Sequence, residues 1–170
     1  MSRRWRSYAR GLSDRTSADT YPPPLRVLIS VVAHSGDSLV WLLVGGLLWA
    51  HASPVARTFG LHIWAIVLVT SLLSLTFKQI FRRPRPMTPP HGFYNTFDRY
   101  SFPSGHAVRV GALTVVLGAA LPVGGIAALA LWSLLVCASR IALRMHFTRD
   151  VIVGLLLGWI TGAVLLMSVV

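Results

Sequence analysis

Two side chains near the C-terminal end have the types and spacing of a catalytic pair. His146 and Asp150 lie four residues apart in the stretch SRIALRMHFTRD (139–150). This spacing stacks two side chains on one helical face, and a carboxylate beside an imidazole fixes its tautomer and stabilises its protonated form. The other ring nitrogen is then free to attack. Taken alone, the pair is more simply explained as a helix-capping histidine and an interfacial aspartate.

A second candidate is the tetrapeptide PSGH at 103–106. Proline and serine before an apolar run are helix start signals, and a helix N-terminus offers free N–H groups and a favourable dipole to an anion. Gly105 lets a ligand approach the backbone closely, and Ser104 lies beside it. His106 would lie next to the anion, where it can donate a proton to a leaving oxygen. An ordinary capped helix start is the alternative for these four residues.

Cations at the ends of apolar segments indicate which ligand this chemistry would act on. Lys78 ends one apolar segment, Arg85 follows between two prolines, and Arg140 lies inside a later segment near its end. An uncompensated guanidinium at that depth is costly, so we expect a bound anion there. The planar fork of arginine suits tetrahedral oxyanions, which favours phosphate. Arg82 and Arg83 are expected to snorkel to the interface or to meet lipid phosphates.

The composition predicts that membrane helices position these residues. The chain has 170 residues, of which 54% are hydrophobic and 12% charged, and its mean hydropathy is +0.64. A soluble domain carries about 25% charged residues, so this chain is expected to be membrane-embedded. The net charge of +11 favours anionic lipid headgroups and a phosphorylated substrate as partners. Nucleic acid is disfavoured because no soluble domain remains to present a basic face.

Apolar segments long enough to span a bilayer predict an all-α, polytopic transmembrane bundle of about five spans. A span needs about 20 apolar residues. The first segment is interrupted by HSGD (34–37), and the third is short. Residues 1–24 are predicted to form a basic polar arm, and residues 25–170 one transmembrane domain. The five segments are 25–50, 60–81, 106–121, 124–144 and 151–170.

Counting five spans also predicts the membrane face of the candidate residues. The N-terminus and the three charged stretches fall on one face, with 15 of the 16 lysines and arginines, and only Arg57 falls on the other. The positive-inside rule places the charged face in the cytoplasm. We therefore expect an integral protein of a bacterial inner membrane with its site on the cytoplasmic face.

Together the three stretches resemble the phosphatidic acid phosphatase type 2 (PAP2) superfamily, whose signature is K-x6-R-P, then P-S-G-H, then S-R-x5-H-x3-D. Lys78 is followed by six residues and Arg85-Pro86, and residues 103–106 match the second element without a change. The third element is complete at 139–150. The resemblance covers about residues 60–165 and implies a PAP2-like helical core. Larger members have six spans, and five predicted segments lead us to expect that the first of the six has no counterpart here.

What the resemblance implies is a metal-independent lipid phosphatase that needs no cofactor. By this resemblance, His146 attacks phosphorus and forms a phosphohistidine, with Asp150 orienting it. His106 protonates the leaving lipid oxygen and then helps to activate water. The phosphate oxygens are held by Lys78, Arg85, Arg140, Ser104 and the Gly105 backbone.

Four further residues are possible substrate contacts. Arg109 follows His106 by three residues, so it is expected to face inward in a supporting role or to contact a headgroup. His34 and Asp37 are candidates for headgroup contacts, but a cap by Asp37 on the first span is the preferred interpretation. Tyr94 lies in an aromatic loop (88–102) at the interface.

The motif recognises only the phosphate, so the lipid stays open. Candidate substrates are polyprenyl phosphates or diphosphates, phosphatidylglycerophosphate, phosphatidic acid and a phosphorylated glycolipid. The alternative from another class is a non-catalytic phospholipid-binding or transport protein that keeps an anion pocket. The sequence does not indicate an oligomeric state.

Overall fold

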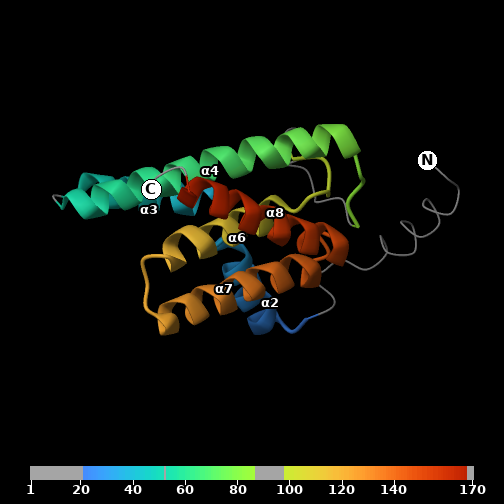
Figure 1. Ribbon diagram of the computed structural model, residues 1–170. Helices are drawn as coiled ribbons and strands as arrows, with labels where there is room; N and C mark the ends of the chain where they lie inside the picture. Colours follow the sequence, from blue (N-terminus) through green and yellow to red (C-terminus); the bar gives the residue numbers. More distant parts are fainter. Residues whose placement is uncertain (1–20, 52, 87–97, 168–170) are drawn as a thin grey trace, which may run out of the picture.

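The computed structural model describes residues 21–51, 53–86 and 98–167, and within these ranges all regular structure is helical. The predicted all-α class is thereby confirmed. Most of the predicted basic arm, residues 1–20, lies outside the described residues. The helices in chain order are α2 (Pro23–His34), α3 (Ser38–Ala50), α4 (Pro54–Phe81), α6 (Gly105–Gly118), α7 (Val123–Ala142) and α8 (Thr148–Met167) (Figure 1).

Among the described residues, three helices are long and apolar enough to cross a membrane, namely α4, α7 and α8. The first predicted span is instead a pair, α2 and α3, bent by 56° at the break between them. The break falls at the interruption predicted at 34–37, and its cause is the polar Ser35-Gly36-Asp37 segment. Exposed apolar side chains such as Leu43 and Leu47 on α3, 69% and 75% exposed, fit a surface that faces lipid.

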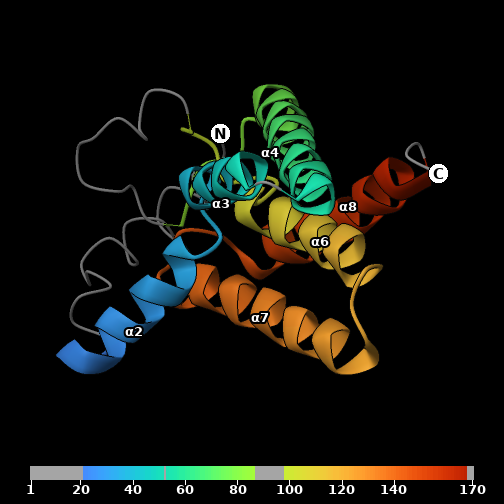
Figure 2. The same cartoon turned by 90° about the vertical axis from the view of Figure 1, so that its left-hand side faces the viewer.

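The third predicted span, α6, is shorter than expected but lies at the centre of the bundle. Its 14 residues extend about 21 Å, less than the hydrocarbon core of about 30 Å. Nine of the 14 residues are buried. Figures 1 and 2 show α4, α7 and α8 arranged around it. A helix covered by neighbours does not need to span the bilayer, which explains its length.

A seam of glycines joins α6 to α8 and fixes the relative position of their first turns. Gly154, Gly158 and Gly162 recur every four residues along one face of α8. A Cβ atom added at Gly158 would lie 2.2 Å from the Val108 carbonyl oxygen, so only glycine permits this approach. At the end of the seam, the Ser104 amide donates to the Asp150 carbonyl at 3.0 Å. The PSGH stretch and the 146–150 stretch are therefore held together.

The break between α2 and α3 packs into the bundle instead of projecting from it. A Cβ added at Gly36 would lie 2.9 Å from Val136 Cγ1 of α7. The indole of Trp132, also on α7, donates to Ser35 Oγ at 2.9 Å. Trp41 of α3 donates to the Ser35 carbonyl at 3.0 Å. Figure 2 shows α2 running beside α7 and away from α3.

Candidate active site

A cavity of about 410 Å³ opens where the end of α4, the start of α3 and the start of α6 meet. Its volume lies within the roughly 300–1,000 Å³ usual for small-molecule sites. Most of its lining side chains are polar, and they come from segments far apart in the sequence. The lining comprises Asp37, Ser38, Leu39, Ser71, Ser74, Leu75, Lys78, Asp98, Gly105, His106 and Arg109.

Two of the predicted phosphate-binding cations share a carboxylate partner that the sequence interpretation missed. Lys78 pairs with Asp98, and Arg85 Nη2 donates to Asp98 Oδ2 at 2.7 Å. Both cationic side chains are only 4% exposed. The Arg85 Nε and Nη1 atoms are buried and have no hydrogen-bond partner in the described part of the chain. Two guanidinium donors thus remain available to an anion.

The carboxylate of Asp98 is held as an anion by these cations. Burial alone would raise its pKa, but the adjacent Lys78 and Arg85 outweigh burial and bring the pKa below its ordinary value. A carboxylate that both cations hold occupies the same electrostatic environment that a phosphate group would use. The site is therefore built to stabilise negative charge at this point.

The candidate nucleophile His146 is buried, 2% exposed, and its ring is held by the main chain. Its Nδ1 lies 2.8 Å from the Ser101 carbonyl oxygen. A carbonyl can only accept, so Nδ1 carries the hydrogen and Nε2 keeps its lone pair. Burial and the charges of Arg85, Arg140 and Lys78 lower the pKa of His146 well below its ordinary value. The ring is therefore neutral and nucleophilic at neutral pH.

Asp150 does not contact the His146 ring, which corrects the expected direct pair. Its buried carboxylate accepts from Arg83 Nη1 at 2.6 Å and from the Phe147 amide at 3.0 Å. The reason is that α8 begins at Thr148, so His146 lies outside the helix and the four-residue spacing does not align the two side chains. Asp150 instead fixes the loop that carries His146.

Arg83 was expected at the interface or on lipid phosphates, and this expectation is wrong. Besides binding Asp150, its guanidinium lies 4.4 Å from the centre of the Phe147 ring. Its side chain is 26% exposed. Arg83 thus helps to hold the loop that carries His146. Its neighbour Arg82 is exposed and donates to the Gln79 carbonyl.

The start of α6 supplies a helix N-terminus to the cavity. Ser104 is the N-cap, and its hydroxyl accepts from the Ala107 amide at 3.5 Å. A Cβ added at Gly105 would meet nothing closer than Ser74 Oγ at 3.6 Å, an ordinary contact. Packing within the protein therefore does not require glycine there, whereas close approach of a ligand to the backbone would.

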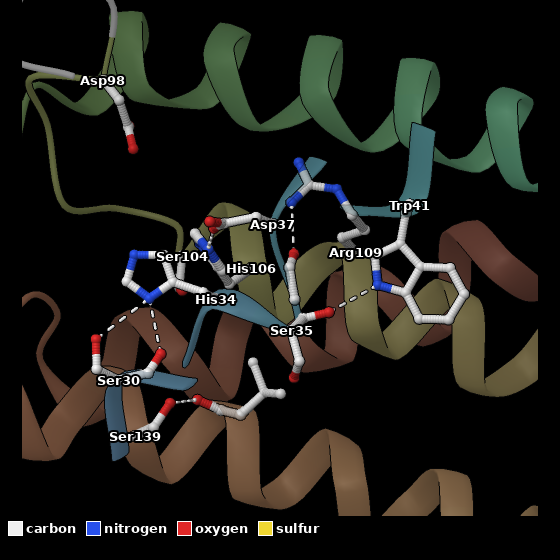
Figure 3. Close-up of polar contacts among 12 residues, drawn as sticks. Ser30, His34, Ser35, Asp37, Trp41, Asp98, Ser104, His106, Arg109 and Ser139 are labelled. Carbon is white, nitrogen blue, oxygen red and sulfur yellow. Dashed lines mark hydrogen bonds and ion pairs between the residues drawn. The ribbon is translucent and has the colours of Figure 1, made fainter. Parts of the chain in front are cut away.

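The contacts of His106 contradict the preferred interpretation of Asp37 as a helix cap. Asp37 makes no side-chain cap bond to α3. Its Oδ1 lies 2.5 Å from His106 Nε2 instead, as Figure 3 shows. Arg109 faces inward and donates to the Gly36 carbonyl at 2.9 Å and to Ser71 Oγ at 3.2 Å. The first turn of α6 thus holds the α2–α3 break through two side chains.

The other predicted residues fall in different places. Arg140 is buried, 5% exposed, and its charge acts on both histidines. His34 is exposed and its Nδ1 bonds the Ser30 carbonyl at 2.7 Å, so it does not line the cavity (Figure 3). Tyr94 lies outside the described residues.

One compositional signal points to the partners that motif matching missed. The chain has only five acidic residues. The three within the described ranges, Asp37, Asp98 and Asp150, each pair with a histidine or an arginine of the site. In those same ranges no group of three or more histidine, cysteine or acidic side chains could hold a metal ion. In a basic membrane protein with few carboxylates, the positions of those carboxylates therefore indicate where the site lies.

Comparison with curated proteins finds phosphatases of lipid phosphates. Decaprenylphosphoryl-5-phosphoribose phosphatase of Mycobacterium tuberculosis is 33% identical over 138 residues, covering 78% of this chain and 74% of that protein. Sphingosine-1-phosphate phosphatase 1 of Mus musculus is 32% identical over 145 residues, covering 78% of this chain but 32% of the mouse protein.

Comparison with solved structures finds the same fold. The crystal structure of LpxE from Aquifex aeolicus superposes with a TM-score of 0.69 at 26% identity, covering 94% of this chain and 92% of that one. A PAP2-type phosphatidylglycerolphosphate phosphatase from Bacillus subtilis shares the fold with a TM-score of 0.68 at 21% identity, covering 96% and 85%. The family model for the PAP2 superfamily matches residues 59–170. The predicted resemblance is confirmed, and this chain belongs to the PAP2 superfamily as an integral-membrane lipid phosphatase.

Proposed function

We propose that this enzyme hydrolyses the terminal phosphomonoester of a polyprenyl-linked phosphosugar through a phosphohistidine on His146. The main observation that supports this reaction is that positive charges from three side chains act on the His146 ring. Lys78, Arg85 and Arg140 all act on His146, whose Nδ1 is held by a carbonyl so that Nε2 is the free nitrogen. Cations around a neutral nucleophile are what phosphoryl transfer requires, because positioning and charge neutralisation supply most of its rate.

The reaction proceeds in two steps. His146 Nε2 bonds to phosphorus as the bond from phosphorus to the leaving oxygen breaks, and protonated His106 gives that oxygen its proton. Water then attacks the phosphohistidine and gives a proton back to His106, which releases phosphate and restores the histidine. Negative charge on the phosphoryl oxygens is held by the backbone at the start of α6, with Ser104 and Gly105, and by the three cations.

Two observations support a hydroxylated headgroup. The chain is similar to decaprenylphosphoryl-5-phosphoribose phosphatase over 74% of that protein's length. The cavity carries hydroxyl groups from Ser38, Ser71 and Ser74, which can bond sugar hydroxyls. A volume of about 410 Å³ accommodates a headgroup and leaves the polyprenyl tail in the bilayer.

A substrate panel in detergent with chelator tests this proposal. We expect phosphate release from a polyprenyl phosphosugar to exceed that from phosphatidylglycerophosphate, phosphatidic acid and undecaprenyl diphosphate by about tenfold or more in kcat/KM, because a site that bonds several sugar hydroxyls disfavours headgroups with one hydroxyl or none. The rate should not depend on added divalent metal. Preference for phosphatidic acid would refute the phosphosugar assignment. Binding of lipid phosphates without any hydrolysis would instead favour a non-catalytic lipid-binding protein.

We further infer that the site faces the cytoplasm of a bacterial inner membrane. The cavity lies at the start of α3 and the end of α4, and the sequence-predicted topology puts the N-terminal segment on that same side. That segment carries six arginines up to residue 26, whereas Arg57 is the sole cation at the opposite end of the sequence-predicted topology. This asymmetry follows the positive-inside rule even when every motif residue is set aside.

Cysteine labelling in intact cells tests the side. The native Cys137 is only 5% exposed, so an introduced thiol reports its own position. Arg6→Cys should resist a membrane-impermeant maleimide until the cells are permeabilised. Arg57→Cys is the matched control and should be labelled in intact cells. The opposite labelling pattern would place the site outside the cytoplasm.

A further inference from the structure

The contact between Asp37 and His106 joins two elements that the family signature does not link. Asp37 follows the α2–α3 break, and His106 lies in the first turn of α6, 69 positions later. Asp37 Oδ1 is 2.5 Å from His106 Nε2, and the two side chains are 18% and 12% exposed. Figure 3 shows the carboxylate facing the ring. Both residues line the 410 Å³ cavity.

The α2–α3 break is fixed on both sides of this contact, so the carboxylate is held in place. Arg109 donates to the Gly36 carbonyl at 2.9 Å from the same helix that carries His106. Trp132 of α7 donates to Ser35 Oγ at 2.9 Å. The absence of a side chain at Gly36 lets the break approach α7 and the His106 ring. Asp37 therefore has little freedom to leave the imidazole.

The charges around His106 explain why a carboxylate is needed there. Burial, Arg140 of α7 and Arg109 of its own helix together lower the pKa of His106 to about 4, and Asp37 is the group that opposes them. Lys78 of α4 lines the same cavity, and His146 lies close enough for the charges of the two histidines to interact. Without a carboxylate beside it, His106 would therefore lose its proton more readily among these cations. Asp98 does not serve this purpose, because it pairs with Lys78 and Arg85.

The free nitrogen of the ring completes the geometry. With Nε2 on Asp37, Nδ1 has no hydrogen-bond partner among the described residues. We propose that Asp37 is a positioning residue that holds His106 Nε2–H, favours the protonated ring during the reaction, and directs Nδ1–H to the leaving oxygen. This proposal rests on the proposed role of His106 as the proton donor. The Nδ1 proton moves to the leaving oxygen and is replaced by a proton from the attacking water.

Leaving-group dependence tests the proposal in the full-length enzyme. In Asp37→Asn, we expect kcat for octyl phosphate, whose alcohol must be protonated to leave, to fall about 100-fold, the scale of general acid catalysis. For 4-nitrophenyl phosphate, whose leaving group needs no proton, the loss should stay below about threefold by the same reasoning. The alkaline limb of the pH–kcat profile should move to lower pH, because the variant holds the donor proton less firmly. Asp37→Glu should recover part of the octyl phosphate rate.

Two control variants separate the possible outcomes. Ser35→Ala removes hydrogen bonds from the same break but keeps the carboxylate, so its melting temperature should fall while its leaving-group dependence and alkaline limb stay as in the parent. His106→Asn should show the selective loss on octyl phosphate. If His106→Asn does so and Asp37→Asn loses both substrates equally with an unmoved alkaline limb, Asp37 is merely structural. If His106→Asn shows no selectivity, His106 is not the donor and both assignments fail.

Discussion

Replacement of His146 by alanine is expected to lower kcat by about 10⁴-fold or more, the scale seen when a covalent nucleophile is removed. The reason is that His146 is the ring on which Lys78, Arg85 and Arg140 all act, so its loss removes the group that attacks phosphorus. The Ser101 carbonyl holds Nδ1, and the low pKa keeps the ring neutral. The measurement is phosphate release from a lipid phosphate by the purified protein in detergent.

The intermediate provides a second readout of the same variant. Phosphohistidine survives alkaline quenching, so the parent enzyme should carry a phosphoryl group by mass spectrometry during turnover, and His146→Ala should not. His51→Ala is the matched control, since His51 is exposed at the opposite end of the bundle and should retain full activity. Activity retained in His146→Ala would rule out this histidine as the nucleophile.

Arg85→Gln is expected to lower kcat/KM by about 10²–10³-fold, as removal of a donor to a developing oxyanion does. Arg85 Nε and Nη1 are buried without a partner in the described residues, so they are available to bind two phosphoryl oxygens at once. Arg85→Lys should restore little, because an ammonium cannot reproduce the planar fork. The loss should appear in steady-state kinetics with the preferred lipid phosphate.

Arg82→Gln is the control for this variant because it removes the same charge from the same segment. Arg82 is exposed, and its Nε donates to the Gln79 carbonyl instead of facing the site. Its kinetics should stay within about twofold of the parent, as surface substitutions usually do. Equal losses in the two variants would mean that only the overall positive potential matters and that Arg85 makes no direct contact with phosphate.

The sequence was sufficient to predict the fold class, the family and the clustering of the cations, because the relevant residues fall at the ends of apolar segments. Charge at a helix end is readable without coordinates. The sequence was not sufficient to predict contacts that depend on the exact residue at which a helix begins. Asp150 misses His146 because α8 begins two residues after that histidine, and spacing alone does not show this.

Contacts across the bundle were also beyond sequence reasoning. A cap and a long-range ion pair are equally compatible with an aspartate before an apolar run, so Asp37 was assigned to the nearer partner. The bond to His106 depends on how the α2–α3 break packs against α6 and α7. Asp98 is 20 positions from Lys78, and no spacing rule in the sequence predicts that the two pair.

The glycine seam between α6 and α8 has a consequence for how the enzyme can diversify. Any side chain larger than a hydrogen atom at these glycines would clash with α6. The first turns of the two helices, which lie beside the phosphate, therefore tolerate little substitution. The α2–α3 break, by contrast, is attached through side chains such as Arg109 and Trp132, which can be exchanged one at a time. Substitutions at the break can therefore change which lipid alcohol the enzyme prefers, while the residues that carry out the phosphoryl transfer stay the same.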